Sequence, residues 1–197
     1  MEGINLVEET VALEGLSLSI LRPLEAEALL SEEAFEHEEY LPYWAELWPS
    51  GVTLARAVAQ RAVEGLRVLE LGCGLGLPSV VAALGGARVL ATDWSAEALE
   101  VTAANAERNG ADVETALVSW SEPETVVDRA PWDLVLGADL LYEQRNVDQL
   151  LSLLPRLGGE ILIAEPGRPA AGRFFEEIGL AVTPLPNRVY RLTGPAP

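Results

Sequence analysis

Short apolar runs alternate with helical stretches along most of this chain, from about Leu66 to its C-terminal end. Five runs have the length and the aliphatic content of buried parallel strands. They span residues 67–71, 88–92, 113–118, 133–138 and 160–164. Segments in which apolar residues recur at helical spacing lie between or after them, over residues 95–109, 147–157 and 168–178. This alternation predicts a doubly wound α/β domain, in which helices cover both faces of a parallel sheet.

The two ends of the chain depart from this alternation. Residues 180–182 and 188–192 flank a Pro-Leu-Pro-Asn turn, which predicts a C-terminal hairpin that places an antiparallel strand in the sheet. Before the first strand we expect a hairpin over 7–22, an acidic helix over 24–40 and an aromatic segment that ends near residue 50.

The length of 197 residues suits a single domain with additional structure. We therefore divide the chain into an N-terminal extension, residues 1–50, and a main domain, residues 51–197. The first helix of the main domain is predicted over 52–63, with Ser50 as its N-cap.

Acidic residues outnumber basic ones by 31 to 13, which leaves a net charge of −18, and every basic residue is an arginine. Nucleic acids and anionic membranes require clustered cations, so both are excluded as partners and a basic partner is favoured. One cysteine and one histidine leave no disulfide framework within the chain and no metal site built on those residues. The first residues lack the parts of a signal peptide and no apolar run reaches the ~18 residues of a membrane span, so we expect a cytoplasmic protein.

A glycine cluster follows the first predicted strand, in the sequence Glu70-Leu-Gly72-Cys-Gly74-Leu-Gly76. Glycines at alternate positions let the backbone turn tightly and let a ligand approach the main chain. Ligands of open α/β sheets bind at the carboxyl ends of the strands, where this loop lies. The dinucleotide fingerprint G-x-G-x-x-G is absent because Leu77 stands where it requires glycine, so the loop indicates a different ligand or, alternatively, a purely structural turn.

An aspartate ends the second predicted strand and a tryptophan follows it. Asp93 can accept hydrogen bonds from both hydroxyls of a ribose, and Trp94 offers an adenine ring a face for stacking. An aspartate in this position is also a common helix cap, so neither residue is specific by itself. In combination with the glycine loop, the pair favours a ligand that contains adenosine.

Residues 68–76, together with Ala91-Thr-Asp93, resemble the S-adenosylmethionine site of the seven-strand class I methyltransferases. The resemblance covers about residues 51–192 and implies a Rossmann-like seven-stranded mixed sheet of order 3-2-1-4-5-7-6 with the last strand antiparallel. It implies S-adenosylmethionine as the cofactor, with Glu70 near its ammonium group, Asp93 on its ribose, and Ser119 and Trp120 at its adenine. The residues expected around the cofactor are Trp48, Glu70, Gly72, Cys73, Gly74, Gly76, Asp93, Trp94, Ser119, Trp120 and Ala138.

Two further segments narrow the class of methyltransferase. Tyr43, Trp44 and Trp48 stand within a short segment before the main domain, where they form a lid over the cofactor or, alternatively, part of the core. Asp139 and Tyr142 follow the fourth strand as a D-x-x-Y tetrad, in place of the N-P-P-Y of enzymes that methylate adenine or glutamine amino groups.

The aromatic segment and the tetrad together resemble the family 16 group of protein lysine methyltransferases. Residues 42–45 and 164–168 look most like the branch that acts on the β-subunit of electron transfer flavoprotein and its bacterial relatives. The resemblance implies a protein substrate that presents lysine, and it makes Asp139 and Tyr142 the candidate catalytic residues.

The chemistry of lysine methylation requires a neutral amine. At pH 7 a free lysine, with a pKa of about 10.4, costs about 4–5 kcal/mol to hold neutral, and desolvation beside a positive sulfur lowers that pKa. We expect Asp139 to orient the amine, and Tyr142 or the pair Trp44 and Trp48 to wall its channel. The alternative for Asp139 is that it only caps the turn that follows it.

The sequence therefore predicts an S-adenosylmethionine-dependent methyltransferase that acts on a lysine of a protein. The alternatives are a small-molecule N- or O-methyltransferase and a cofactor-binding module without turnover. The glutamate-rich stretch over 32–39 is either a solvated helix face or a docking surface for a basic substrate.

Overall fold

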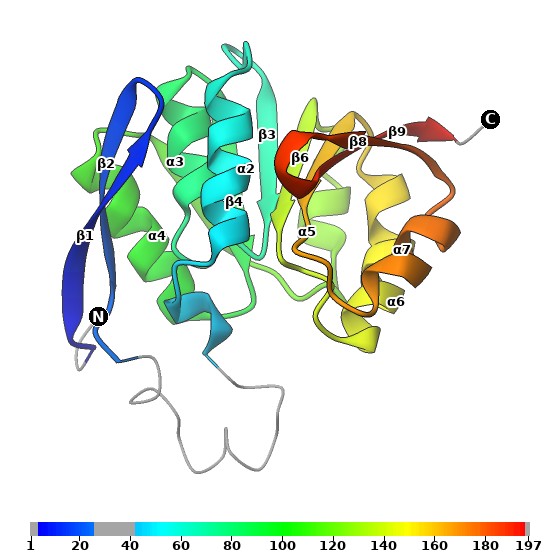
Figure 1. Ribbon diagram of the computed structural model, residues 1–197, viewed down its shortest axis with the longest axis horizontal. Coiled ribbons are helices and arrows are strands. Elements are labelled where there is room, and N and C mark those ends of the chain that lie inside the picture. The colour runs from blue at the N-terminus through cyan, green and yellow to red at the C-terminus, as the bar shows by residue number, and fades with distance from the viewer. Residues whose placement is uncertain (1–3, 26–41, 196–197) are drawn as a thin grey trace.

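The computed structural model describes residues 4–25 and 42–195, which form one seven-stranded sheet, a separate two-stranded hairpin and the helices around them (Figure 1). The strands of the large sheet are β3 (Arg67–Leu71), β4 (Arg88–Asp93), β5 (Val113–Leu117), β6 (Leu134–Ala138), β7 (Glu160–Ala164), β8 (Leu180–Leu185) and β9 (Val189–Pro195). Their order is β5-β4-β3-β6-β7-β9-β8, which confirms the predicted order 3-2-1-4-5-7-6 when the strands are counted from β3. The last strand, β9, pairs antiparallel with both β7 and β8, as predicted.

The connections between the strands are mostly helical. The helices are α2 (Pro49–Ala59), α3 (Leu77–Leu84), α4 (Ala96–Arg108), α5 (Glu124–Val127), α6 (Gln144–Leu153) and α7 (Ala171–Glu177). Three 3-10 turns complete the described elements: η3 (Tyr43–Ala45), η4 (Leu154–Arg156) and η5 (Pro186–Arg188). None of the helices in 4–25 and 42–195 is long and apolar enough to cross a membrane.

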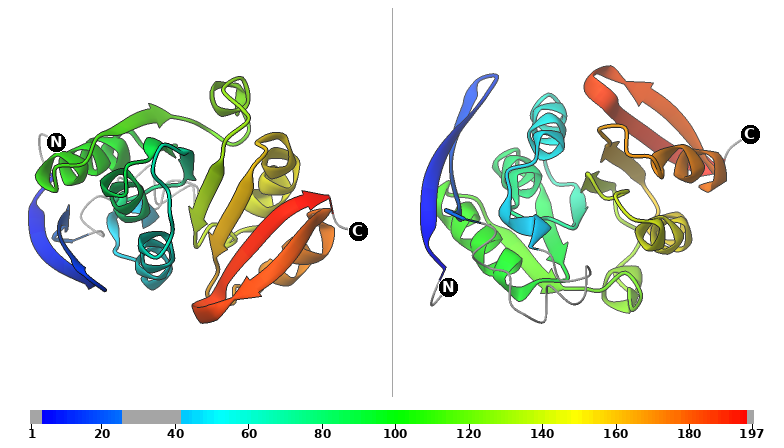
Figure 2. Two further views of the ribbon diagram at one scale, coloured as in Figure 1. Left: turned by 90° about the horizontal axis from the view of Figure 1, so that it is seen from above. Right: turned by 60° about the horizontal axis from the view of Figure 1, so that its bottom comes forward.

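Alternate side chains of the central strands point into two hydrophobic cores, one on each face of the sheet. In β6, Leu134 and Leu136 pack with residues of α2 and α3, whereas Val135 packs with residues of α6 and α7. This period of two is that of a strand buried on both faces. The helices accordingly lie on both sides of the sheet (Figure 2), as the alternation of strands and helices predicts.

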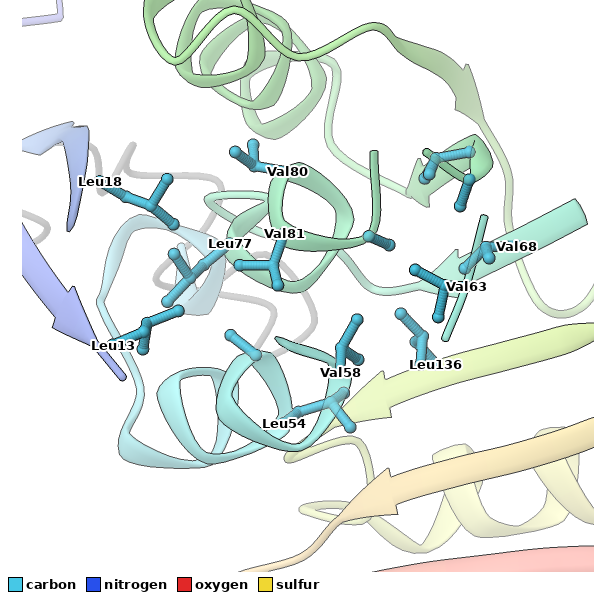
Figure 3. Packing of buried hydrophobic residues seen from close by; sticks show 14 of the residues in the cluster. Leu13, Leu18, Leu54, Val58, Val63, Val68, Leu77, Val80, Val81 and Leu136 are labelled. Carbon is cyan, nitrogen blue, oxygen red and sulfur yellow. The ribbon is translucent and has the colours of Figure 1, made fainter. Parts of the chain in front are cut away.

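The N-terminal hairpin consists of β1 (Leu6–Leu13) and β2 (Leu16–Pro23), close to the predicted range of 7–22. It lies at the opposite end of the molecule from β8 and β9, beside α4 (Figures 1 and 2). Leu13 and Leu18 from this hairpin pack in one core with Leu54 of α2 and Leu77 of α3 (Figure 3). The hairpin therefore shares a core with the elements that carry the glycine loop.

The start of α2 corrects one prediction. The helix begins at Pro49 rather than at residue 52, its N-cap is Trp48, and no side chain forms a cap hydrogen bond there. Ser50 lies buried inside the first turn, so it is not the N-cap. Proline is favoured in the first turn of a helix because its missing N–H has no partner to lose there. The acidic helix predicted over 24–40 falls almost wholly outside the described residues, and the division of the chain at residue 50 stays a prediction.

Candidate active site

The glycine loop connects the end of β3 to the first turn of α3. The backbone N–H of Cys73 donates to the carbonyl of Thr92 at 2.9 Å, which holds the loop against the end of β4. Gly76 is the N-cap of α3 with a φ of 74°, in the left-handed region. A Cβ on Gly76 would lie 2.6 Å from Cγ2 of Thr102 in α4, so both the backbone angle and the packing require glycine.

Asp93 ends β4 and supports the glycine loop through its carboxylate. One oxygen accepts a hydrogen bond from the backbone N–H of Gly74 and the other from that of Ser95, each at 3.0 Å. Asp93 is only 4% exposed, and burial raises the pKa of its carboxyl group above the ordinary value. Ser95 in turn is the N-cap of α4, because its hydroxyl accepts from the N–H of Ala98.

Glu70 is buried at the end of β3 and faces the start of α3. Its carboxylate accepts hydrogen bonds from the backbone N–H of Ser79, at 2.9 Å, and from the hydroxyl of the same residue. Burial raises the pKa of Glu70 to about 8, so the group is largely protonated at neutral pH. The predicted place of Glu70, beside the ammonium group of the cofactor, stays a prediction.

A cavity of about 380 Å³ opens at the carboxyl ends of β3, β4, β5 and β6. All thirteen residues predicted for the cofactor and for catalysis line it: Trp48, Glu70, Gly72, Cys73, Gly74, Gly76, Asp93, Trp94, Ser119, Trp120, Ala138, Asp139 and Tyr142. This edge of an open α/β sheet is where ligands bind, and the volume is in the range of small-molecule sites. The structure thus brings the predicted residues together, and their individual roles remain predictions.

Asp139, which follows β6, lines the cavity. Asp139 has a φ of 55°, and its backbone N–H donates to the carbonyl of Ala164 at the end of β7. Its carboxylate accepts two hydrogen bonds from the guanidinium of Arg168, from Nε at 2.8 Å and from Nη2 at 3.0 Å. Hydrogen bonding to Asp139 raises the pKa of Arg168, which keeps the guanidinium charged. The partner of Asp139 is therefore a second charged side chain, 29 residues further along the chain.

Aromatic rings gather beside Asp139. The ring centroid of Tyr43 lies 5.1 Å from that of Tyr142 and 6.5 Å from that of Trp48. The indole N–H of Trp48 donates to the carbonyl of Tyr43 at 2.7 Å, which fixes this pair. Trp44 lines the cavity and also packs against the core of α2 and α3. Its position therefore agrees with both alternatives for the aromatic segment, a lid over the cofactor and a part of the core.

The described residues fit the S-adenosylmethionine that the sequence resemblance implies. A Cβ on Gly72 would lie 2.9 Å from the side chain of Leu140 and 3.4 Å from that of Trp120. Because glycine has no Cβ, this space at the cavity wall stays free and a ligand can approach the backbone. Asp93 has two carboxylate oxygens with about four acceptor positions. The backbone N–H groups of Gly74, Ser95 and Trp94 use part of them, and the remainder can accept from a ribose hydroxyl. Trp94 is 45% exposed beside the cavity, where its ring can stack on an adenine.

Several cavity residues were not identified from the sequence. They are Glu46, Leu140, Arg145, Asn146 and Gln149. Asn146 is buried and donates from its amide to the carbonyl of Leu140, which stabilises the turn that carries Tyr142. Arg145, Asn146 and Gln149 lie on α6, directly after the D-x-x-Y tetrad, and that place was the available signal for these three. Arg168 belongs to the segment 164–168 that carries part of the family resemblance. Its contact with Asp139 has no local signal, because the two residues follow different strands, β7 and β6.

Curated proteins with similar sequences include lysine methyltransferases. The chain is 36% identical over 136 residues to the electron transfer flavoprotein beta subunit lysine methyltransferase of Xenopus laevis, which covers 64% of this chain and 53% of that protein. It is 36% identical over 120 residues to protein N-lysine methyltransferase METTL21A of Danio rerio, which covers 57% of this chain and 55% of that protein. The chain thus spans about half the length of the curated relatives it matches.

Solved structures show the same fold. A 16S rRNA methyltransferase of T. thermophilus, in complex with S-adenosylmethionine and guanosine, superposes with a TM-score of 0.69 at 14% identity over 97% of this chain and 51% of that chain. A ribosomal protein methylase of Lactobacillus delbrueckii has a TM-score of 0.56 at 26% identity, over 72% of this chain and 76% of that chain. The profile of one family, described as lysine methyltransferase, matches residues 36–179. The chain therefore belongs to this lysine methyltransferase family of S-adenosylmethionine-dependent enzymes.

Proposed function

We propose that this chain transfers a methyl group from S-adenosylmethionine to the side-chain amine of a lysine in a protein substrate. The observation that carries the proposal is the cavity at the carboxyl edge of the sheet, which joins the glycine loop and Asp93 to Asp139 and its aromatic neighbours. The first group fits an adenosyl cofactor, and the second fits a cationic side chain.

The cofactor would be held by residues from three strand ends, those of β3, β4 and β5. The backbone of 72–76 and the carboxylate of Asp93 would contact the methionine and ribose parts, while Trp94, Ser119 and Trp120 would surround the adenine. When bound, the cofactor supplies a methyl group on a positively charged sulfur. The chain's contribution is positioning, which supplies most of the acceleration of an in-line displacement.

The acceptor part of the cavity would orient the lysine and lower the pKa of its amine, so that the neutral form is favoured. Asp139 would accept a hydrogen bond from the amine, which fixes the direction of its lone pair. Tyr43, Tyr142 and Trp48 would exclude water from the channel, and desolvation favours the neutral amine over the ammonium. The net charge of −18 favours a basic surface on the substrate protein.

The relatives suggest the first substrate to test, since several are named for the electron transfer flavoprotein beta subunit. We also propose that the protein acts in a reducing compartment such as the cytoplasm, which its single cysteine, buried in the glycine loop, permits. The proposed main domain, residues 51–197, carries every cavity residue except those of the aromatic segment.

The test is an incubation of the purified chain with tritiated S-adenosylmethionine and either recombinant electron transfer flavoprotein or a bacterial lysate, followed by gel electrophoresis. We expect a labelled protein band. Label found only in small molecules would support a small-molecule methyltransferase instead, and cofactor binding without any label would support a binding module. A chain that binds no cofactor at millimolar concentration would contradict all three.

A further inference from the structure

The contact between Asp139 and Arg168 is a bidentate ion pair at the acceptor end of the cavity. The carboxylate of Asp139 is 7% exposed, and the side chain of Arg168 is 35% exposed. Asp139 lines the cavity, whereas Arg168 is not among the described residues that do so. Arg168 therefore neutralises Asp139 from outside the cavity and leaves the cavity itself open to an acceptor.

The loop between β7 and α7 is built to present this guanidinium. One carboxylate oxygen of Glu165 accepts from the backbone N–H groups of Gly167 and Arg168, at 2.7 and 2.5 Å. The guanidinium of Arg188 donates to the carbonyl of Pro166 at 2.6 Å, which ties the loop to the C-terminal hairpin. The guanidinium of Arg168 also lies over the ring of Trp48, 5.7 Å from its centroid. Contacts from three parts of the chain thus fix Arg168.

A bare carboxylate in this position would work against the proposed reaction. An opposite charge stabilises the charged form of a titrating group, so an unpaired Asp139 would hold a lysine as its ammonium, which cannot attack. A carboxylate paired with arginine carries little net charge, but its remaining acceptor positions still take an N–H hydrogen bond. When it is paired with Arg168, Asp139 can therefore orient the amine without stabilising its charged form.

The other charged and titratable groups near the pair do not replace this effect. Glu165 follows β7 and accepts a hydrogen bond from the backbone N–H of Arg168. Burial raises the pKa of its carboxyl group, which favours the neutral form. Arg145 is paired with Glu143 at 2.6 Å. The remaining titratable groups of the described cavity lining are Tyr43, Glu46, Glu70, Cys73, Asp93 and Tyr142. None of these is a cation, so the positive charge that faces Asp139 is that of Arg168.

We propose that Arg168 is a positioning residue that neutralises Asp139, so that the acceptor site orients a lysine amine without holding it in its protonated, unreactive form. This inference rests on the proposed function, because it assigns a task within that reaction. It predicts that removal of the Arg168 charge makes the site a better binder of ammonium ions and a poorer catalyst near neutral pH.

The first test uses binding alone, with n-butylammonium as the probe for a lysine side chain. Calorimetry at pH 7 compares wild type and Arg168→Gln, each saturated with S-adenosylhomocysteine. We expect the variant to bind n-butylammonium about tenfold more tightly, which corresponds to about one pKa unit of added preference for the cation. The gain should disappear in the double variant Arg168→Gln with Asp139→Asn, and it should weaken at high salt.

The second test is the pH profile of kcat/KM with the protein substrate that the wild type labels. We expect the acid limb of the profile to move upward by about one pH unit in Arg168→Gln. Arg168→Lys keeps the charge and should restore most of the wild-type profile. Arg173→Gln is the matched control, because it removes an exposed arginine that pairs with Asp148 and Glu177 outside the described cavity lining. It should leave the profile unchanged.

Two results would overturn the inference. One is an Arg168→Gln variant with unchanged n-butylammonium affinity and an unshifted pH profile. The other is a variant that loses turnover equally at all pH values together with affinity for S-adenosylhomocysteine, since Arg168 would then only support the fold. The proposed function fails separately, if the wild type labels no protein while the binding difference between the variants is still observed.

Discussion

The side-chain amide of Asn105, in α4, is hydrogen bonded to both backbone groups of Leu21 in β2, accepting from its N–H at 2.7 Å and donating to its carbonyl at 3.0 Å. The same amide donates to the carbonyl of Leu75 in the glycine loop at 2.9 Å. Asn105 is fully buried. One side chain therefore joins the N-terminal hairpin to the loop that we assign to the cofactor.

Asn105→Ala tests this connection. The substitution leaves three backbone groups without their partner, the two of Leu21 in partly buried contacts and that of Leu75 in a buried one. We expect the free energy of unfolding to fall by about 2–4 kcal/mol. We also expect weaker binding of S-adenosylmethionine, because the carbonyl of Leu75 loses its donor. Asn109→Ala is the matched control. The side chain of Asn109 is hydrogen bonded to both backbone groups of Ser19 in the hairpin, and none of its described hydrogen bonds reaches the glycine loop. Urea unfolding and calorimetry measure both quantities, and equal loss of cofactor affinity in the two variants would contradict the connection.

Gly76→Ala tests the packing of the glycine loop against α4. The new Cβ would meet Thr102, which cannot move away cheaply because its hydroxyl donates to the carbonyl of Gly74 at 2.9 Å. Gly110→Ala is the control, because Gly110 has a similar φ of 68° and its Cβ would meet nothing within 4 Å. We expect Gly76→Ala to lose about 1–3 kcal/mol more stability than the control, together with cofactor affinity. Equal losses in thermal unfolding would show that backbone strain alone is at work.

Glu70 should make stability depend on pH. Burial raises its folded-state pKa from 4.5 to about 8, so the folded protein holds a proton that the unfolded chain releases between these values. The free energy of unfolding should therefore fall as the pH rises from about 4.5 to 8, by about 2–4 kcal/mol from this group. Glu70→Gln removes the effect, whereas Glu122→Gln, on the surface, should keep it. Urea unfolding between pH 5 and 8.5 measures the slopes, and parallel slopes for wild type and Glu70→Gln would refute the assignment.

Asp139→Ala tests the assigned role of the acceptor carboxylate. The substitution removes the orienting acceptor and leaves the charge of Arg168 unpaired, which repels a substrate ammonium. At saturating S-adenosylmethionine we expect turnover to fall by about 100-fold or more, while the affinity for the cofactor stays near that of wild type. Turnover close to wild type would show that Asp139 only caps the turn after β6.

Much of the fold follows from local patterns. Apolar runs with turn residues at their ends locate the strands, and Ser95 marks the start of α4 because a cap and its helix are neighbours in sequence. The strand order came from the family resemblance, since the runs themselves carry no information about which strands pair. The start of α2 was placed three residues late, although Pro49 carried the signal of a first helical turn.

The candidate site was predictable in its membership and less so in its contacts. Strand ends meet at one edge of a parallel sheet, so Gly72, Asp93 and Asp139 had to lie near one another. The pairs that set the electrostatics are long-range and depend on side-chain packing. Arg168 reaches Asp139 across 29 positions, and Asn105 reaches Leu21 across 84. No periodicity or spacing encodes such contacts.

The most direct measurement identifies the methylated residue. Substrate protein labelled with tritiated S-adenosylmethionine is hydrolysed to amino acids, and the labelled products are separated by chromatography. The chain contains no lysine, so labelled methyl-lysine cannot come from the enzyme itself. We predict label in methylated lysine that is lost with Asp139→Ala. Label in methylated arginine or glutamine, or none in protein, would contradict the proposed lysine methyltransferase activity.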